Sequence, residues 1–193
     1  MFCYLNSKKI VVLNMSKVLK ILDLGCGNKK REGATGVDYN DRTAADIVHN
    51  LNEFPYPFED NSIDKIYLDN TLEHLDDVIG VMEEVYRICK PGAEVKVIVP
   101  YFRSLWAFTD PTHLHYFTVN SFSYFDPEHI ICKRYDYTLA RFKTNKIIFN
   151  ETLKDGKFKN IVKKLANRWP WRYEYYLSHF YPLDDITYYL IKI

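Results

Sequence analysis

The segment from Ile21 to Asn28, with the sequence ILDLGCGN, constrains the fold more than any other part of the chain. An apolar run ends in an acid, Asp23, and then turns through two glycines. Glycine has no Cβ, so Gly25 and Gly27 let the backbone approach a ligand closely at the C-terminal end of a strand, where open α/β sheets bind ligands. A carboxylate fifteen residues after Asp23, at Asp38, can accept hydrogen bonds from both hydroxyls of a ribose. The segment therefore predicts a nucleoside site on an α/β sheet.

The rest of the chain alternates strand-like apolar runs with polar turns from Val18 onward, which is typical of a parallel sheet with crossover connections. Apolar residues at spacings of three and four predict a helix over 76–90, ended by Lys90, Pro91 and Gly92. A basic amphipathic helix is predicted over 157–169, and 137–149 reads as a strand pair or one bent strand. Other strands are predicted at 19–24, 34–38, 45–51, 64–69, 94–100 and 186–193. We expect an α/β, Rossmann-like, doubly wound and mostly parallel sheet with an antiparallel C-terminal strand, built as a three-layer sandwich.

Five motifs occur in a fixed order: DLGCG at 23–27, GVD at 36–38, DIVHNL at 46–51, TLEHL at 71–75 and KPG at 90–92. With these motifs the chain resembles the class I S-adenosylmethionine-dependent methyltransferases, in particular a small type-11-like group that also carries a DPTH motif. The resemblance extends from Leu19 to Phe125. It implies an enzyme that binds S-adenosylmethionine and transfers its methyl group.

The resemblance also implies roles for individual residues. Asp23 and Gly25 would face the methionine moiety, Gly27 would lie beneath the ribose, and Asp38 would bind the ribose hydroxyls. Asn50 and Leu51 would border the adenine, and Asp69 and Asn70 would border the amino acid and the sulfonium. We include the flanking residues, so the expected cofactor site comprises Asp23, Gly25, Cys26, Gly27, Asp38, Tyr39, Asn50, Leu51, Asp69 and Asn70.

The connection after the first strand departs from the common family pattern. GNKKREGATG, from residue 27 to 36, is too short and polar for a full helix, so we expect an extended loop. S-adenosylmethionine carries no phosphate, so it does not need the helix N-terminus that binds a pyrophosphate. The same feature counts against a dehydrogenase, which would need GxGxxG opening a helix.

Candidates for chemistry follow the fourth and fifth strands. Methyl transfer is an in-line displacement, so holding the acceptor against the methyl group supplies much of the catalysis, and a base helps when the acceptor is a hydroxyl. His74 follows Glu73 in TLEHL, and either a base or a backbone-bonded structural role fits it. The catalytic candidates are His113, His74, Asp110 and His115, with Tyr116 beside them; a polar network that fixes the loop is the alternative. His113 and His115 lack a third ligand at suitable spacing, so we expect no metal site.

Charge is divided unevenly along the chain, although the net charge is only +1. Residues 38–85 contain 13 acids and 2 bases, whereas residues 132–172 contain 12 bases and 3 acids. The two regions can simply attract each other, or the basic one can receive an anionic acceptor. Cys3, Cys26, Cys89 and Cys132 form no CxxC pair, so neither a zinc site nor a disulfide framework is indicated.

We expect a small-molecule acceptor, with a hydroxyl of a sugar or glycan precursor preferred, because relatives with a DPTH-type loop are often associated with polysaccharide assembly. The alternatives are an RNA or protein methyltransferase, a non-catalytic protein that binds S-adenosylmethionine, and peripheral membrane association through residues 159–171. No DNA partner is expected. No apolar run is long enough to span a membrane, so we expect a cytoplasmic protein of undetermined oligomeric state.

The predicted methyltransferase domain covers residues 18–193, with substrate-side insertions at 101–130 and 150–182. Residues 1–17 form an N-terminal extension. Met15 would be a natural start for the domain, so residues 1–14 are expected to be dispensable.

Overall fold

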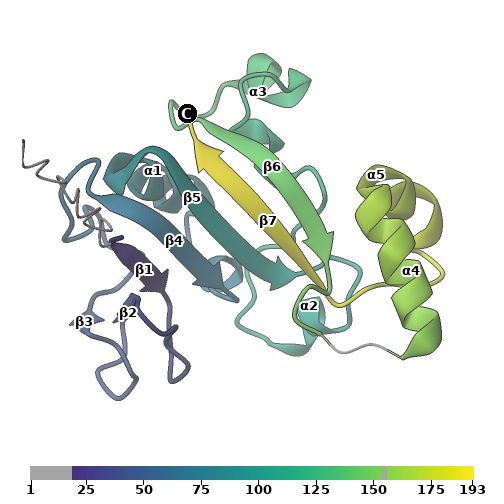
Figure 1. Ribbon diagram of the computed structural model, residues 1–193, viewed down its shortest axis with the longest axis horizontal. Helices are drawn as coiled ribbons and strands as arrows, with labels where there is room; N and C mark the ends of the chain where they lie inside the picture. The colour runs from purple at the N-terminus through teal and green to yellow at the C-terminus, as the bar shows by residue number, and fades with distance from the viewer. Residues whose placement is uncertain (1–18, 154–155) are drawn as a thin grey trace, which may run out of the picture.

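The computed structural model describes residues 19–153 and 156–193, so the predicted extension at 1–17 lies outside the described residues. Its centre is a seven-stranded sheet in the order β3-β2-β1-β4-β5-β7-β6, seen nearly face-on in Figure 1. Six strands run in the same direction, and β7 runs antiparallel to both of its neighbours. The strands are β1 Ile21–Leu24, β2 Thr35–Asp38, β3 Ile47–Val48, β4 Ile63–Asp69, β5 Cys89–Pro100, β6 Phe142–Phe149 and β7 Asp185–Lys192. The predicted α/β, Rossmann-like and mostly parallel sheet, with its antiparallel C-terminal strand, is confirmed.

Most helices are short. The α-helices are α1 Val78–Ile88, α2 Trp106–Thr109, α3 Ile130–Tyr135, α4 Lys157–Arg168 and α5 Pro170–Arg172. Single turns of other helix types are η1 Leu72–His74, η2 Ser121–Tyr124 and η3 Tyr173–Leu177. Among the described residues, none of these helices has the length and apolar character needed to cross a membrane.

Three predicted boundaries were wrong, each for a local reason. The third strand shrinks to two residues because it pairs only with the end of β2, where Val37 faces Ile47. The first long helix ends at Ile88, so Lys90, Pro91 and Gly92 lie within β5 instead of ending the helix. Of the two alternatives for 137–149, the single bent strand is confirmed, with a register shift between Thr144 and Lys146, but it begins only at Phe142. The predicted absence of a helix between β1 and β2 is confirmed.

The core lies on one face of the sheet, because side chains alternate between faces along each strand. Leu68, Val97 and Tyr188 point into this core, where they meet the inner face of α1 and a cluster of aromatic side chains from residues 117–125. The opposite face carries the partly exposed Lys65 and Tyr67. The core therefore supports the sheet from one side and leaves the edge at the carboxyl ends of β1 and β4 free to carry a site.

Candidate active site

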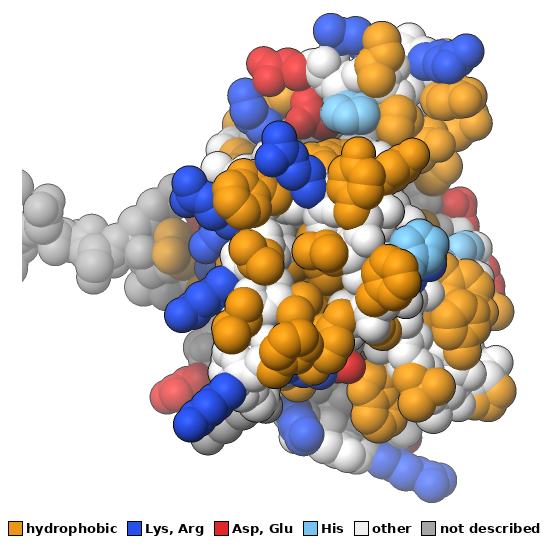
Figure 2. All heavy atoms as spheres, turned by 90° about the vertical axis from the view of Figure 1, so that its right-hand side faces the viewer, with side chains coloured by type: hydrophobic (Ala, Val, Ile, Leu, Met, Phe, Trp, Pro, Cys, Tyr) orange, Lys and Arg blue, Asp and Glu red, His pale blue; other side chains and the backbone are white. Residues whose placement is uncertain are grey.

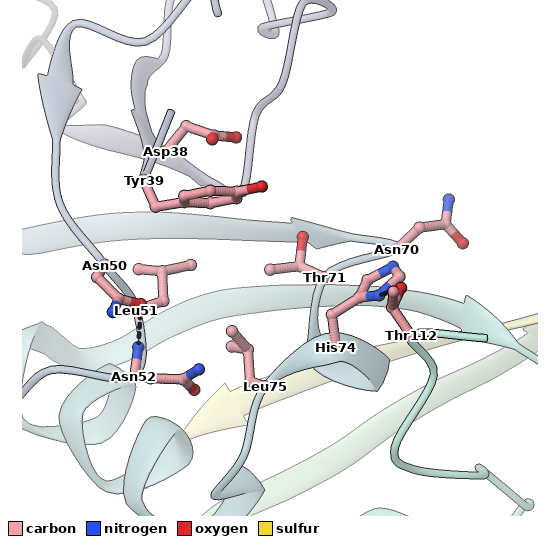
Figure 3. Close-up of a pocket in the computed structure, with 11 residues that line it drawn as sticks. Asp38, Tyr39, Asn50, Leu51, Asn52, Asn70, Thr71, His74, Leu75 and Thr112 are labelled. Atoms are coloured by element: carbon pink, nitrogen blue, oxygen red, sulfur yellow. Dashed lines mark hydrogen bonds between the residues drawn. The ribbon is translucent and has the colours of Figure 1, made fainter. Parts of the chain in front are cut away.

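A cavity of about 650 Å³ opens where β1 and β4 end side by side (Figure 3). The strand order changes direction at this point: β2 and β3 follow on the β1 side of the sheet, and β5 follows on the β4 side. Open α/β sheets bind ligands at such a switch point. The cavity is lined by Gly25, Asp38, Tyr39, Asn50, Leu51, Asn52, Asn70, Thr71, His74, Leu75 and Thr112. The structure thus brings six of the ten expected cofactor residues to one cavity.

The turn after β1 is shaped by Gly25 and Thr71. Gly25 has φ +72°, a left-handed conformation that favours glycine, and a Cβ there would lie 2.4 Å from the hydroxyl oxygen of Thr71. That hydroxyl donates a hydrogen bond to the Leu24 carbonyl at 3.1 Å. The first turn and the start of η1 are therefore packed directly against each other at the floor of the cavity.

The carboxylate of Asp38 is held in place by backbone groups. One oxygen accepts a hydrogen bond from the Gly27 N–H at 2.9 Å, and the other accepts one from the Asn40 N–H at 3.0 Å. A carboxylate oxygen has more than one lone pair, so both oxygens can still accept bonds from a ligand. Beside it, the ring of Tyr39 is 75% exposed and stands over the cavity (Figure 3).

The far wall of the cavity, formed by residues 50–52, follows β3. The side-chain oxygen of Asn50 accepts a hydrogen bond from the Asn52 N–H at 3.1 Å, which closes a tight turn. The side-chain oxygen of Asn52 accepts one from the Asp76 N–H at 2.9 Å and so connects this turn to the segment before α1. Leu51 is buried and supplies the apolar surface between the two amides.

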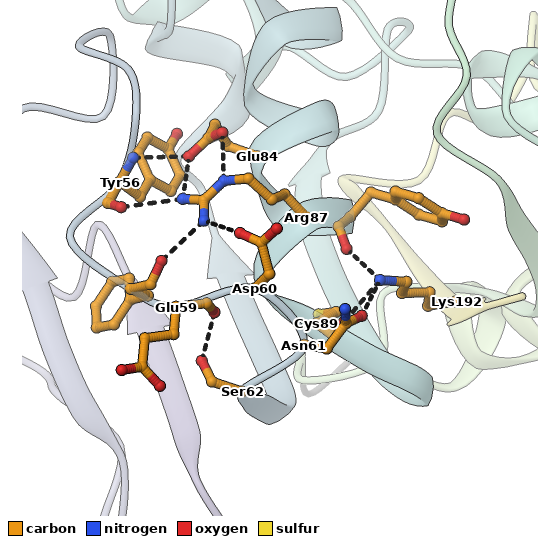
Figure 4. A network of polar contacts seen from close by, with 11 residues as sticks. Tyr56, Glu59, Asp60, Asn61, Ser62, Glu84, Arg87, Cys89 and Lys192 are labelled. Atoms are coloured by element: carbon orange, nitrogen blue, oxygen red, sulfur yellow. Dashed lines mark hydrogen bonds and ion pairs between the residues drawn. The ribbon is translucent and has the colours of Figure 1, made fainter.

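A guanidinium at the end of α1 holds the loop that continues from this wall (Figure 4). Arg87 makes two hydrogen bonds to the Glu84 carboxylate, at 2.8 and 2.7 Å, and donates to the carbonyls of Tyr56 and Phe58 and to Asp60. The hydrogen bonds from Arg87 hold the pKa of the Glu84 carboxyl below the ordinary value for glutamate. The loop between β3 and β4 is therefore fastened to α1 by one charged network.

Four of the expected cofactor residues do not line the cavity: Asp23, Cys26, Gly27 and Asp69. The buried Asp23 carboxylate accepts a hydrogen bond from the Arg31 N–H at 2.8 Å, and Asp69 forms an ion pair with the Arg31 guanidinium. Burial raises the pKa of Asp23, and the neighbouring Asp69 raises it further. The Arg31 guanidinium also lies 4.1 Å from the ring centre of Tyr67, so the loop between β1 and β2 covers both acids.

A second, more open pocket of about 560 Å³ lies beside the cavity and shares Asn70 and His74 with it. Its other lining residues are Glu73, Pro100, Trp106, Thr109, Asp110, Pro111 and His113. Trp106, which is 60% exposed, gives this pocket an aromatic wall. This second pocket therefore joins residues that follow β4 to residues of the aromatic segment after β5.

Glu73 is the most unusual side chain of the second pocket. It is 1% exposed, and neither carboxylate oxygen has a hydrogen-bond partner among the described residues. Burial raises the pKa of this carboxyl to about 8. Its backbone carbonyl accepts a hydrogen bond from the Leu114 N–H at 2.7 Å, which brings residues 110–116, called here the DPTH segment, against η1.

Two imidazoles stand next to Glu73, with ring centres 4.7 Å apart. Thr112 donates its hydroxyl hydrogen to Asp110, so it accepts a hydrogen bond from Nδ1 of His74, at 2.9 Å. Nδ1 of His113 donates to the carbonyl of Ala107 at 3.1 Å. With the proton on Nδ1 in both rings, each Nε2 carries a lone pair.

The other candidates of the DPTH segment have structural partners. Asp110 accepts hydrogen bonds from the backbone and side chain of Thr112, and these lower its pKa. His115 is not part of the cluster, because its Nε2 donates to the Leu75 carbonyl at 2.8 Å. The ring of Tyr116 stacks on Phe108. His115 and Tyr116 therefore fit the alternative role, in which their contacts hold the loop in place. His113, by contrast, lines the second pocket.

Sequence reasoning missed four residues that line the cavity, namely Asn52, Thr71, Leu75 and Thr112. Three of them directly adjoin expected residues or lie within TLEHL, so proximity to the motifs was the available signal. Thr112 lies in the DPTH motif directly before His113, but that motif was expected to contribute to the chemistry, and only the fold brings it back to η1 and the cavity.

Comparison of the structure with solved proteins identifies the fold. A methyltransferase from Archaeoglobus fulgidus described as S-adenosylmethionine-dependent superposes with a TM-score of 0.56 at 17% identity, covering 91% of this chain and 87% of that one. One from Mesorhizobium loti gives 0.57 at 12% identity, with coverages of 90% and 91%. Phosphoethanolamine N-methyltransferase 2 of Haemonchus contortus gives 0.52 at 15% identity, with coverages of 90% and 48%. The fold is that of the S-adenosylmethionine-dependent methyltransferases.

The sequence adds a family match. Residues 22–96, which include β1 to most of β5, match the family described as methyltransferase domain. No curated protein sequence matches the chain. The matched segment is less than half of the chain; together with the fold, it supports a methyl-transferring enzyme that uses S-adenosylmethionine as its cofactor.

Proposed function

We propose that the protein transfers the methyl group of S-adenosylmethionine to a hydroxyl of a small, polyhydroxylated acceptor such as a sugar or a glycan precursor. The observation that carries this proposal is the second pocket, which adjoins the cavity after β1 and shares Asn70 and His74 with it. An acceptor in the second pocket would meet a cofactor in the cavity at these two residues. In-line displacement requires that kind of adjacency.

The lining of the second pocket favours a sugar-like acceptor. Trp106 offers an exposed aromatic face, and the apolar face of a pyranose ring packs well on such a surface. Glu73, His74 and His113 line the same pocket and offer acceptor atoms for hydroxyl hydrogens. A pocket with both an apolar surface and a polar cluster matches a ring that has carbon on its faces and hydroxyls at its edge.

For the cofactor, the Asp38 carboxylate would accept hydrogen bonds from the ribose hydroxyls, and the wall at Asn50 and Leu51 would contact the adenine. The methionine end would then extend along β4 toward Asn70, which puts the methyl group at the entrance of the second pocket. Asp23 and Asp69 lie beyond the cavity lining, so we assign them an indirect role: they position Arg31 and the loop above the methionine end.

The first test is calorimetric titration with S-adenosylmethionine and S-adenosylhomocysteine, with NAD as the control ligand. Micromolar binding of the two sulfur compounds alone is expected. Transfer of label from methyl-labelled cofactor is then measured with free hexoses and sugar nucleotides, and with bulk RNA and protein as competing acceptors. Labelled sugar supports the proposal, whereas label confined to RNA or protein contradicts it. Trp106→Ala should raise the acceptor KM and leave the cofactor Kd unchanged.

A further inference from the structure

The side chains of Glu73, His74 and His113 converge on one point in the second pocket. Each offers one ligand atom, and the three atoms lie within 4.8 Å of one another. Glu73 and His74 come from η1, whereas His113 comes from the segment after α2, about 40 residues later. Spacing along the chain could not reveal this set, which explains why His113 and His115 alone predicted no metal site.

Both imidazoles are oriented as metal ligands require. Histidines that bind a metal through one ring nitrogen usually donate the other N–H to an oxygen, which fixes the tautomer. Nδ1 of His74 donates to Thr112, whose hydroxyl is held by Asp110, and Nδ1 of His113 donates to the Ala107 carbonyl. These outer contacts leave the two Nε2 lone pairs as the electron donors of the cluster.

The third donor lacks any partner. Burying a carboxyl group that is 1% exposed is costly when neither oxygen has a partner, because burial removes its water without a replacing hydrogen bond. No Lys or Arg among the described residues forms a salt bridge with Glu73. A bound cation would satisfy this carboxylate and both lone pairs at once.

We propose that Glu73, His74 and His113 bind one divalent transition metal ion, with Zn²⁺ as the best match to two imidazoles and one carboxylate. Such a donor set binds zinc at about 2.0–2.2 Å and leaves a fourth position open. The three side chains would move slightly inward to reach these distances. The open position faces the pocket that Trp106 and Asn70 also line.

A role for the ion in methyl transfer rests on the proposed function, whereas binding of the ion does not. A hydroxyl bound to such an ion loses its proton near neutral pH. Its oxygen then forms the new bond to the methyl carbon, the carbon–sulfur bond of the cofactor breaks, and S-adenosylhomocysteine leaves. The hydroxyl proton passes to water at the open side of the pocket.

The test uses the full chain, freed of metal with a chelator that is then removed. Zn²⁺ binding is measured by calorimetry, and Co²⁺ binding by its visible absorption bands. One equivalent of each ion is expected to bind, and His113→Ala and Glu73→Gln should weaken binding at least tenfold. His115→Ala is the matched control, because His115 lies two residues away with its Nε2 engaged by Leu75, and it should bind like the parent protein.

Three results separate this proposal from the proposed function. Absence of stoichiometric binding, or equal binding by His113→Ala and Glu73→Gln, overturns the metal site even if sugars are methylated. Stoichiometric binding that depends on both residues supports the site even if no sugar is methylated. Circular dichroism of each variant confirms that a loss of binding does not reflect unfolding.

A second, independent inference concerns the face formed by α4, α5 and η3, at the right of Figure 1. Figure 2 shows this side of the molecule, where hydrophobic side chains gather on the surface with Lys and Arg around them. On α4, Phe158, Ile161 and Leu165 form a stripe at spacings of three and four, and all three are exposed. The inner positions Val162 and Ala166 are buried, so this outer stripe is not part of the core.

This face is basic, which favours an anionic partner. Residues 156–180 contain six Lys or Arg and one acid, Glu174, which accepts a hydrogen bond from the Val119 N–H. Two copies of such a basic face would repel each other. Aromatic side chains beside basic ones, as at Trp169 and Trp171, suit the interface of an anionic bilayer. We propose that this face docks on an anionic lipid surface.

Co-sedimentation with vesicles tests this proposal. The protein should bind phosphatidylglycerol–phosphatidylcholine vesicles at low salt and bind pure phosphatidylcholine at least tenfold less. The double variant Phe158→Ser with Ile161→Ser should lose binding, whereas Leu139→Ser, an 84% exposed leucine outside this face, should keep it. No binding to anionic vesicles, or a dimer in analytical ultracentrifugation that the double variant abolishes, overturns the proposal.

Discussion

Gly25 and Thr71 are packed so closely that a Cβ added at residue 25 would lie 2.4 Å from the threonine hydroxyl oxygen. The two residues follow different strands, β1 and β4, so their contact ties the turn after one strand to the end of the other. That turn forms part of the cavity lining, and its shape depends on both residues.

Gly25→Ala should therefore weaken both the fold and cofactor binding. A non-glycine residue at this positive φ costs about 1–3 kcal/mol of stability, and the contact with Thr71 forces the turn to shift. Urea unfolding measures the first effect, and calorimetric titration with S-adenosylhomocysteine measures the second. The double variant Gly25→Ala with Thr71→Ser should recover part of the affinity, because it removes one of the colliding atoms. A single variant with parental affinity would contradict the prediction.

Asp38→Asn tests the ribose contact. The amide keeps the size of the carboxylate but loses its charge and one acceptor oxygen, and hydrogen bonds to a charged group are worth about 1.5–3 kcal/mol. The Kd for S-adenosylmethionine should rise about tenfold to a hundredfold. Asp41→Asn, at an exposed position three residues away, is the control and should bind normally. Equal affinity of Asp38→Asn and the parent would remove Asp38 from the cofactor site.

The Arg87 network predicts a dependence of stability on acid pH. The folded pKa of Glu84 is held below the ordinary 4.5 by its hydrogen bonds to Arg87. Its contribution is therefore fully present above pH 4.5 and is lost as the pH falls through the lower folded value. Urea unfolding at pH 7 and at about pH 3.5 should show a smaller loss for Glu84→Gln than for the parent. An equal loss in both proteins would refute the assignment.

Arg87→Met should lower the free energy of unfolding at pH 7 by about 2 kcal/mol, because the variant leaves the partly buried Glu84 carboxylate without its cation. Since the same network fastens the loop that follows residues 50–52, the Kd for S-adenosylhomocysteine should also rise. Lys143→Met, which removes an exposed ion pair with Glu128, is the control and should change neither quantity.

His113→Ala should separate binding from turnover. His113 lines the second pocket and not the cavity, so cofactor affinity should stay nearly unchanged while kcat falls about a hundredfold or more. Calorimetry with S-adenosylhomocysteine and a methyl-transfer assay measure the two quantities. A large loss of cofactor affinity would place His113 elsewhere in the mechanism.

Much of the cofactor cavity was predictable because its determinants are local. Gly25 and Asp38 each lie at the end of a short apolar strand, and the parallel arrangement of those strands brings the two residues to the same edge of the sheet. The loop between β1 and β2 was predictable for the same reason, since its ten residues are too few and too polar for a helix.

The second pocket was not predictable in the same way. Glu73 and His113 meet only because the backbone of the DPTH segment pairs with the backbone of η1. That pairing depends on the path of the chain after β5, where short helices replace any regular pattern. The same irregular path sends Nε2 of His115 to a backbone carbonyl and Nε2 of His113 toward the pocket, although the two residues are neighbours in sequence.

The loop between β1 and β2 also sets how the cofactor end of the sheet opens. It is held chiefly by Arg31, through Asp23, Asp69 and the ring of Tyr67, and by the ion pair of Lys30 with Asp46. A packed helix at this place would share the stability of the core, whereas a loop held by a few polar contacts opens locally at a much smaller free energy. We therefore expect a nucleoside the size of S-adenosylmethionine to enter and leave without the unfolding of any strand, and its rate of exchange to rise with salt concentration.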